Sequence, residues 1–244
     1  MKPAPTLELE HELFSGGITR IAGMDEVGRG ALAGPVTVGV AVVDRAVGVV
    51  PVTLRDSKLL RPSERVTLVP EVESWALEVR TGTASPAEID AFGIVAALRL
   101  AGSRALAALP RELRPDLVLL DGVHDWLTPP PAGLFPDDAA AGTADAGSLP
   151  SSVADEDAEE VLAPWDGPVR TVVKGDLRCA SIAAASVVAK VDRDALMTGL
   201  HDRHPAYGWA GNKGYGSAAH RAAILERGAT DLHRRSWNLG LAGR

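Results

Sequence analysis

Two adjacent carboxylate residues, Asp25 and Glu26, stand directly before a Gly-Arg-Gly turn at residues 28–30. They follow residues 19–24, whose composition is typical of a β-strand. Because successive strand residues face opposite sides of a sheet, both carboxylates can reach one site only where the strand ends and glycine lets the backbone turn. Either acid alone would be read as a surface residue before a turn. A dinucleotide site requires a helix after its glycines, and residues 36–43 are strand-like instead, which argues against such a site.

Two further acids follow short apolar runs of the kind found in buried strands. Asp121 ends the run at residues 117–120, and Asp176 lies just after residues 169–173. Carboxylates at the ends of several strands of an α/β sheet meet at one edge, where ligands usually bind. Four acids there would repel one another unless cations neutralised them. Oxygen ligands favour Mg²⁺ or Mn²⁺, and two such ions about 3.5–4 Å apart are the usual arrangement for in-line phosphoryl displacement.

The elements that must position these acids alternate between strands and helices. Predicted strands cover residues 19–24, 36–43, 76–81, 116–120 and 169–173, the first two as a hairpin. Ser85-Pro86-Ala87-Glu88 is a capping box that opens a helix to Leu109, and an alanine-rich helix spans residues 181–200. We expect an α/β fold with a mixed β-sheet flanked by helices and a helical C-terminal part.

The composition is that of a folded domain: of 244 residues, 46% are hydrophobic and 23% charged. No apolar run approaches the roughly 20 residues that span a bilayer, and residues 1–12 lack the apolar core of a signal peptide. We therefore expect a cytoplasmic protein without a membrane partner. The single cysteine, Cys179, excludes an internal disulfide and a cysteine zinc site, and is expected to be a small buried side chain. His201 and His204 have the spacing of metal ligands, but no further ligand follows them.

The formal net charge of −7 is unevenly distributed along the sequence. Residues 1–124 carry −3, residues 125–168 carry ten acids and no base, and residues 169–244 carry +6. The middle stretch is rich in proline and alanine and cannot bury enough apolar surface to offset its ordering entropy. We predict that it is a largely disordered insertion, with a structured acidic lid as the alternative. It divides a catalytic domain, formed by residues 18–124 and 169–244, that follows an N-terminal extension at 1–17. Outside the insertion, the charge is compatible with a nucleic-acid partner.

A series of motifs follows along the chain outside the extension and the insertion. In order they are Ile21-Ala22-Gly23-Met24-Asp25-Glu26-Val27-Gly28-Arg29-Gly30 with Gly34-Pro35-Val36, Asp56-Ser57-Lys58, Leu120-Asp121-Gly122, Lys174-Gly175-Asp176 with Arg193-Asp194, Lys213-Gly214-Tyr215-Gly216 with His220, and His233-Arg234-Arg235-Ser236. Together they resemble the motifs of ribonuclease HII, the bacterial type 2 ribonuclease H family. The long insertion departs from the family pattern, as do Asn212, where histidine is expected, and Trp237, where phenylalanine is usual.

The resemblance implies a ribonuclease H-like fold and an endonuclease that cuts the RNA strand of RNA/DNA hybrids. It also implies cleavage 5′ of single ribonucleotides embedded in duplex DNA, leaving 5′-phosphate and 3′-hydroxyl ends. The catalytic and metal-binding acids that it assigns are Asp25, Glu26, Asp121 and Asp176, with two Mg²⁺ or Mn²⁺ ions in the active complex. The expected partners are the hybrid and ribonucleotide-containing duplex DNA, bound by a monomer; no protein partner is implied.

The resemblance also implies substrate contacts. Gly28, Arg29 and Gly30 match the loop that grips the ribose 2′-OH, the group that distinguishes RNA from DNA. Tyr215 matches a tyrosine that packs against the deoxyribose on the far side of the cut. The complete set of expected substrate-binding residues is Gly28, Arg29, Gly30, Ser57, Lys58, Lys190 and Tyr215, with Lys174 and Arg193 as further candidates for phosphate contacts. A solvated side chain is the alternative for each basic residue, and an ion pair with Asp194 is the alternative for Lys190.

Two other classes of function are compatible with the four acids. One is a different two-metal nuclease on the same fold, such as a junction resolvase or a type 3 ribonuclease H; the loop at residues 28–30 and Tyr215 argue against both. The other is a nucleic-acid-binding protein that has lost catalysis, against which the presence of all four acids argues. Cleavage of a duplex containing one ribonucleotide would separate these classes.

Overall fold

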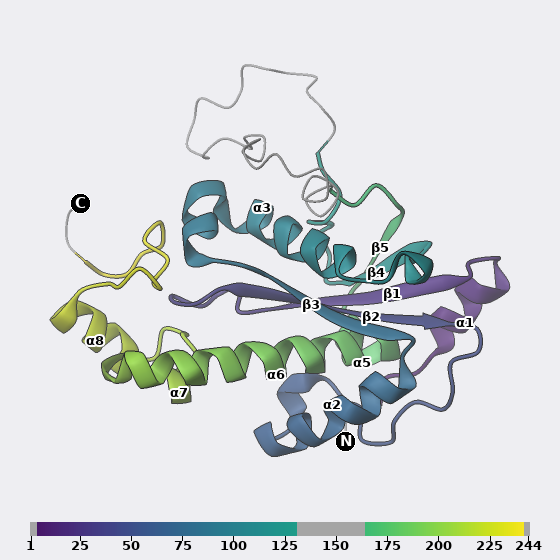
Figure 1. Cartoon of the computed structure of the whole chain (residues 1–244), viewed down its shortest axis with the longest axis horizontal. Coiled ribbons are helices and arrows are strands. Elements are labelled where there is room, and N and C mark those ends of the chain that lie inside the picture. The colour runs from purple at the N-terminus through teal and green to yellow at the C-terminus, as the bar shows by residue number, and fades with distance from the viewer. Residues whose placement is uncertain (1–3, 131–163, 242–244) are drawn as a thin grey trace.

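The computed structural model describes residues 4–130 and 164–241, and within them a mixed sheet of five strands in the order β3-β2-β1-β4-β5 (Figure 1). The strands are β1 (Arg20–Val27), β2 (Val36–Asp44), β3 (Glu78–Ala84), β4 (Leu117–Asp121) and β5 (Val169–Val172). The pairs β1-β2 and β2-β3 are antiparallel, whereas β1-β4 and β4-β5 are parallel. The predicted hairpin, the three other strands and the mixed character of the sheet are confirmed.

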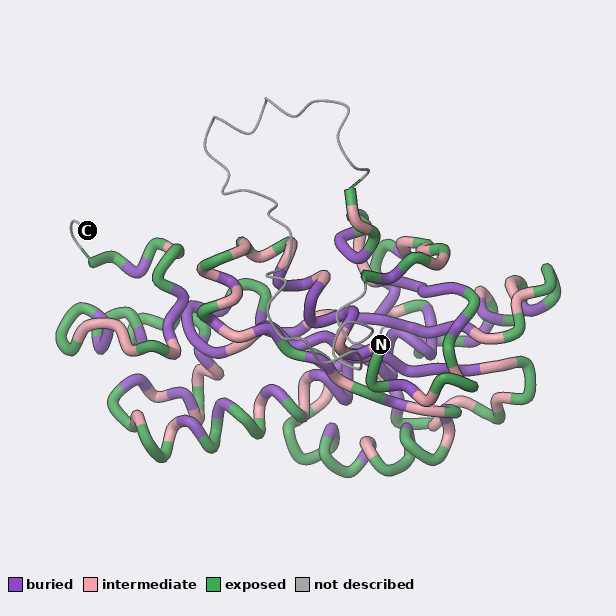
Figure 2. The backbone as a smooth tube through the Cα atoms, turned by 45° about the horizontal axis from the view of Figure 1, so that its top comes forward, coloured by how far each residue is buried: buried purple, intermediate pink, exposed green. Residues whose placement is uncertain are grey.

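Helices cover both faces of this sheet (Figure 1). Helix α3 (Pro86–Ala107) packs on one face, and α1 (Glu8–Ser15), α2 (Pro62–Trp75) and α6 (Ala180–Arg203) pack on the other. The alternation of strand side chains produces the two cores: β1 sends Ile21 to the face under α6 and Met24 to the face under α3. Figure 2 shows the consequence, with buried residues concentrated in the strands between the helical layers.

Both predicted helices are confirmed. The Ser85 hydroxyl accepts a hydrogen bond from the Glu88 amide at 3.2 Å, and the Glu88 carboxylate accepts one from the Ser85 amide at 2.7 Å, so the capping box that begins α3 is formed. The alanine-rich start of α6 lies very close to the sheet. A Cβ atom at Gly23 of β1 would lie 2.2 Å from the Ser181 backbone, so a side chain there would push α6 away.

The segment predicted as an N-terminal extension includes a helix that packs on the domain. In α1, Phe14 is buried in the core under α6. The buried Glu10 carboxylate accepts hydrogen bonds from the Ser181 amide at 3.0 Å and from its hydroxyl at 2.7 Å. A carboxylate at the N-terminus of a helix satisfies free amides and interacts favourably with the helix dipole. Helix α1 therefore caps α6, a role that the sequence did not predict.

The two ends of the predicted insertion are also part of the core. Trp126, Leu127 and Trp165 are buried with α3 and the sheet, and Trp126 and Leu127 contact Gly102 of α3. The expectation that residues 125–168 contribute no core is therefore wrong at both ends, because these large apolar side chains fill the space beside α3. Residues 131–163, where the prediction of disorder falls, lie outside the described residues.

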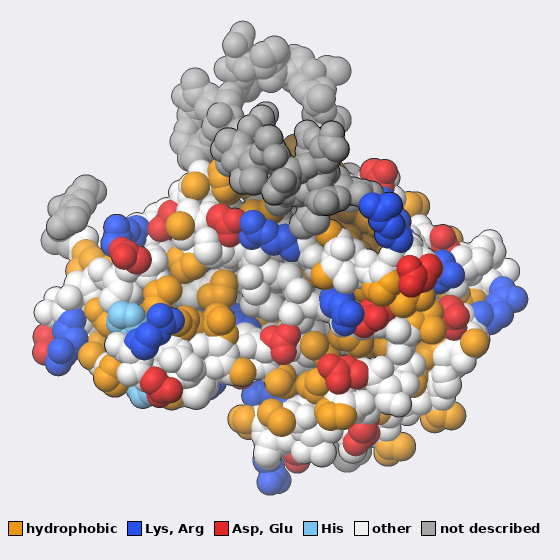
Figure 3. Space-filling view, viewed as in Figure 1, with side chains coloured by type: hydrophobic (Ala, Val, Ile, Leu, Met, Phe, Trp, Pro, Cys, Tyr) orange, Lys and Arg blue, Asp and Glu red, His pale blue; other side chains and the backbone are white. Residues whose placement is uncertain are grey.

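The predicted helical C-terminal part is confirmed. It comprises the end of α6, a 3₁₀ turn at Pro205–Tyr207, α7 (Trp209–Asn212) and α8 (Ala218–Arg227), and it has a core of its own around Trp209 and Ile224. Two other 3₁₀ turns lie at Ser57–Leu59 and Arg111–Leu113. None of the helices in the described residues is long and apolar enough to cross a membrane. On the face seen in Figure 3, basic and acidic side chains are interspersed.

Candidate active site

The four predicted acids are carried by three elements at one edge of the sheet. Asp25 and Glu26 lie near the end of β1, Asp121 ends the neighbouring parallel strand β4, and Asp176 lies in the short helix α5 (Gly175–Arg178) just after β5. The register places Met24 of β1 opposite Leu120 of β4. The chain therefore reaches Asp25 and Asp121 at the same level of the sheet.

The electrostatic environment joins these acids into one cluster. Burial, together with the nearby charges of Asp121 and Glu26, raises the pKa of Asp25 to about 8 against an opposing hydrogen bond from the Ser186 hydroxyl. Burial, with the charge of Asp121, also raises the pKa of Glu26 despite its contact with Arg29, and burial with the charge of Asp176 raises the pKa of Asp121. Burial is the largest cause of these raised pKa values, and the repulsion between carboxylates that adds to it would be relieved by a cation.

Basic side chains partly compensate this charge. The Lys58 ammonium lies 3.2 Å from an Asp176 oxygen, although 70% of the Lys58 side chain is exposed. Arg29 lies 3.3 Å from Glu26. The amide of Gly175, the residue next to Asp176, donates a hydrogen bond of 2.7 Å to Asp121. Lys58 therefore occupies the position beside Asp176 where positive charge is needed.

The donor chemistry of this cluster fits a hard divalent cation. All four side chains offer carboxylate oxygen, the ligand that Mg²⁺ and Mn²⁺ prefer, and burial together with neighbouring carboxylates raises the pKa of Asp25, Glu26 and Asp121. In the part of the chain that the structure describes, no three Asp, Glu, His or Cys side chains are grouped closely enough to ligate one ion. Lys58 contacts the Asp176 carboxylate and the Gly175 amide contacts the Asp121 carboxylate, so each of these two acids has its own partner in the protein.

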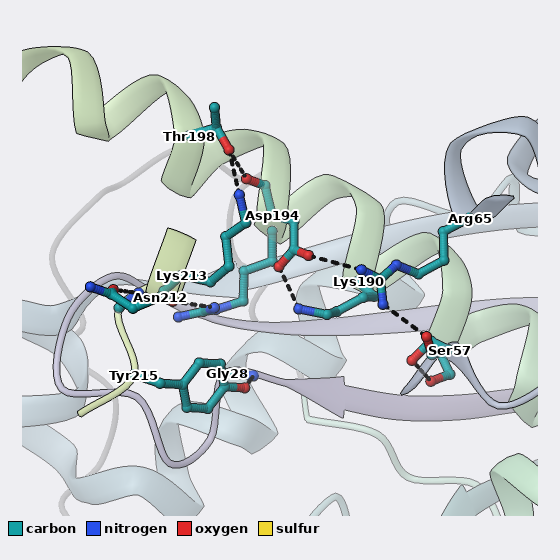
Figure 4. Close-up of polar contacts among 12 residues, drawn as sticks. Gly28, Ser57, Arg65, Lys190, Asp194, Thr198, Asn212, Lys213 and Tyr215 are labelled. Atoms are coloured by element: carbon teal, nitrogen blue, oxygen red, sulfur yellow. Dashed lines mark hydrogen bonds and ion pairs between the residues drawn. The ribbon is translucent and has the colours of Figure 1, made fainter. Parts of the chain in front are cut away.

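Two of the expected substrate-binding elements meet beside the acids. The Gly28 amide donates a hydrogen bond of 3.2 Å to the Tyr215 hydroxyl, although the two residues are 187 positions apart (Figure 4). Tyr215 remains 39% exposed, and Arg29 and Gly30 are exposed as well. Arg29, Gly30 and the Tyr215 ring are thus accessible near Glu26, whereas Gly28, which joins the loop to Tyr215, is buried.

Other expected substrate-binding side chains are already engaged within the protein (Figure 4). The buried Ser57 hydroxyl is 2.9 Å from the Ser186 hydroxyl, and the Ser57 carbonyl accepts a bond of 2.8 Å from Arg65. Lys190 lies 2.6 Å from Asp194, so the ion pair that the spacing offered as an alternative is confirmed. Lys58 remains mostly exposed beside the acids, and Lys174, two residues before Asp176, is exposed as well.

Arg193 has a different place from the one expected. Its guanidinium is only 1% exposed and donates to three backbone carbonyls, those of Ala33, Pro35 and Lys213, so a direct phosphate contact is wrong for this structure. Arg234 is equally buried and bonds the loop after β1. The motif that contains Arg234 was evident in the sequence, but nothing in it indicates which carbonyls an arginine will contact.

The remaining chemically active residues have structural positions. Cys179 is buried as expected, and burial raises the pKa of its thiol to about 12. His204 packs against the rings of Tyr207 and Trp209, at centroid distances of 6.4 and 5.4 Å. Asn212, one of the departures from the family pattern, donates to the Tyr207 carbonyl at 2.7 Å and accepts from the Gly214 amide at 2.8 Å. It therefore fixes the turn before Tyr215.

Known proteins resemble this chain over nearly its whole length. The family model described as Ribonuclease HII matches residues 22–132 and 145–239. A ribonuclease HII from Streptomyces avermitilis is 45% identical over 234 residues, covering 96% of this chain and 83% of the relative. A crystal structure of ribonuclease H2 from Pyrococcus horikoshii has a TM-score of 0.60 at 22% identity, covering 90% of this chain and 94% of that one.

A further solved structure, Bst-RNase HIII in complex with Mn²⁺, has a TM-score of 0.59 at 18% identity, covering 91% of this chain and 68% of that one. At this identity the two solved structures support the fold, whereas the family model and the Streptomyces relative establish the family. The chain therefore belongs to the ribonuclease HII family of endoribonucleases, which hydrolyse the RNA strand of RNA/DNA hybrids.

Proposed function

We propose that this enzyme cleaves both continuous RNA/DNA hybrids and duplex DNA with a single embedded ribonucleotide, cutting 5′ of the ribonucleotide by a two-metal mechanism. The observation that carries the proposal is the contact between Gly28 and Tyr215 beside the four acids. A loop that can read a 2′-OH and a ring that can pack on a sugar lacking one lie next to each other. The enzyme can therefore sense the step from ribose to deoxyribose on one strand.

The residues that would hold Mg²⁺ or Mn²⁺ are Asp25, Glu26, Asp121 and Asp176. The bound ions would supply a nucleophilic water and stabilise the leaving 3′-oxygen, which gives 5′-phosphate and 3′-hydroxyl products. The similar fold of the ribonuclease HIII bound to Mn²⁺ supports this assignment. The residues of the protein would contribute in three ways. The acids favour cation binding because their charges repel one another, Lys58 holds Asp176 in place, and burial limits the access of water to Asp25.

Substrate recognition would use the exposed part of the same surface. The Arg29 and Gly30 amides face no acceptor among the described residues, so they are free to donate to a phosphate or a 2′-OH. Lys58 is placed to approach a phosphate next to the cut, where it would exchange its carboxylate partner for a substrate oxygen. The interaction with phosphates is expected to weaken as salt rises.

The test is cleavage of three labelled substrates in Mg²⁺ and in Mn²⁺. They are a continuous RNA/DNA hybrid, a DNA duplex with one ribonucleotide, and a DNA four-way junction. We expect cleavage of the first two, with the cut 5′ of the lone ribonucleotide, and none of the junction. Cleavage of the hybrid alone would restrict the function to ordinary ribonuclease H activity, and binding without cleavage in either metal would indicate a protein that has lost catalysis.

A further inference from the structure

The loop after β1, residues 28–35, has most of its carbonyl oxygens turned into the protein. Arg234 donates to the carbonyls of Gly28 at 2.7 Å, Arg29 at 2.8 Å and Gly34 at 3.1 Å. A single planar guanidinium thus joins the two ends of the loop. The rigid fork of donors in arginine suits such a task, which a lysine ammonium cannot reproduce with the same geometry.

A second arginine holds the same loop from α6. Arg193 donates to Ala33 at 3.2 Å and to Pro35 at 2.9 Å, and a third bond of 2.9 Å reaches Lys213, two residues before Tyr215. The guanidinium also lies 5.5 Å from the centre of the Tyr215 ring, a cation–π distance. Arg193 therefore connects the loop to the segment that carries Tyr215.

Neither guanidinium has an acidic partner. Arg193 and Arg234 are 1% and 0% exposed, and no ion pair in the described residues includes either one. Burial and the neighbouring Arg193 charge lower the pKa of Arg234 to about 9, which leaves it charged at neutral pH. Burying two unpaired charges is costly, and apolar side chains would fill the same volume with less penalty. Each guanidinium instead donates to backbone carbonyls of the loop after β1, so its polar contacts act on the loop and not on the core.

The loop sequence fits this arrangement. Gly28 has a φ of +87°, and a Cβ atom there would lie 2.0 Å from the Arg193 Nε atom. Only glycine leaves room for the Arg193 side chain under the loop. With the carbonyls of Gly28 and Arg29 bound from below, the amides of Arg29 and Gly30 are left on the exposed side.

We propose that Arg193 and Arg234 are positioning residues that preorganise the loop at residues 28–35 for substrate binding. The inference rests on the proposed function, in which this loop contacts the substrate. A loop held in its binding conformation before the substrate arrives avoids the entropy cost of ordering during binding. The two arginines would therefore act on affinity, through the shape of the loop, while the acids that perform hydrolysis are left unchanged.

The test compares Arg234→Lys with the wild type and with Arg235→Lys as a matched control. Arg235 is the adjacent residue in the chain, but its side chain is exposed and paired with Asp231 at 2.6 Å. We expect KM for the hybrid to rise about tenfold in Arg234→Lys with kcat changed less than about threefold, because the binding loop alone is loosened. Arg235→Lys should match the wild type.

The salt dependence of binding separates positioning from direct contact. Arg234→Gln removes the charge, so a direct phosphate contact would lower the slope of log K against log salt by about one, whereas a positioning residue should leave the slope unchanged. A lower melting temperature with wild-type KM would mean a purely structural role and would overturn the proposal, as would a changed slope.

Arg193→Lys is measured in the same way if Arg234→Lys does not fold. If neither variant folds, the two arginines are required for folding itself and the positioning role is refuted. An inactive wild type would instead refute the proposed function. If the wild type cleaves the hybrid and the variants have the same KM as the wild type, the positioning role is refuted and the proposed function is not.

Discussion

At the scale of single residues, the four acids are distinguished by their environment as much as by their type. Asp25 is 4% exposed and lies in a negative field, whereas Asp121 is partly exposed and receives a backbone amide. The sequence predicted the identity of these residues and the edge at which they lie. It could not predict that Lys58 pairs with Asp176, because that contact joins residues 118 positions apart.

Replacing Asp25 or Asp121 by asparagine should abolish cleavage while leaving hybrid binding largely intact. Each change removes a ligand charge but keeps the shape of the side chain, so we expect a loss of at least about a thousandfold in kcat. Cleavage assays and filter binding in Ca²⁺ would measure the two effects. Asp125→Asn, at an exposed position on the same connection, is the control. Full activity of either site variant would refute the site assignment.

Tyr215→Ala should reduce cleavage at a single embedded ribonucleotide more than cleavage within a continuous hybrid. A duplex with a lone ribonucleotide can be bound productively in one register, so loss of the ring that we propose packs on the adjacent deoxyribose acts on that register directly. A continuous hybrid offers many registers. The change also removes the hydroxyl that accepts from Gly28. Tyr215→Phe separates the two contributions, since it keeps the ring. Equal losses on both substrates would contradict a junction-sensing role.

At the scale of elements, the sequence predicted those with a clear pattern and missed those without one. The five strands and the helices α3 and α6 were evident from alternation, capping residues and alanine content. Helix α2 contains Pro70, which interrupts the helical signal, and α1 depends on the contact of Glu10 with Ser181, which lies 171 residues away. Such tertiary contacts are what short elements need for stability.

Two buried histidines form a hydrogen-bonded chain in the C-terminal part. His220 Nδ1 donates to the Tyr215 carbonyl at 2.9 Å, and its Nε2 accepts from Trp209 at 3.1 Å. His233 Nδ1 accepts from the Thr230 amide at 3.0 Å, so its Nε2 donates to His220 Nε2 at 3.2 Å. Every ring nitrogen is used by the neutral form, and a proton added to His233 Nδ1 would displace the Thr230 amide and leave the Thr230 hydroxyl, 3.0 Å away, as its acceptor.

The C-terminal part should therefore lose stability in mild acid. Burial, with the charges of His220, His204 and Arg235, lowers the pKa of His233 to about 4 from 6.5. His233 therefore takes up a proton at a higher pH in the unfolded chain than in the folded protein. Its contribution to the free energy of unfolding is fully present above pH 6.5 and decreases as the pH falls towards 4, by at most about 3 kcal/mol. Thermal unfolding against pH would show this, with a smaller slope in His233→Gln and no change in the exposed control His124→Gln. A wild-type stability that is flat from pH 7 to 4 would contradict it.

At the scale of the whole molecule, the main difference from the sequence prediction is the extent of the acidic insertion. Its overall composition indicated a segment without core, and an average over 44 residues concealed the three apolar residues at its ends, Trp126, Leu127 and Trp165. The composition of a segment is an average over residues that the folded structure places in different environments.

Two deletion variants therefore test the middle of the insertion separately from its buried ends. Replacing residues 131–163 by a short Gly-Ser linker removes eight acids and none of the described core, so we expect a folded enzyme that binds hybrid more tightly at low salt. Replacing residues 126–166 also removes the three buried side chains, each worth about 2–5 kcal/mol, and should unfold the protein or lower its melting temperature sharply. Equal stability of the two variants would contradict this assignment.

The order of the elements along the chain also has a consequence during synthesis. When residues 1–130 have left the ribosome, four of the five strands and three of the four acids exist, but α6 does not. The sheet face that α6 will cover, including Ile21 and Leu119, is then open to water. The nascent protein must keep this apolar face from associating with other chains until the C-terminal third emerges, and it lacks Asp176 of the candidate site before that moment.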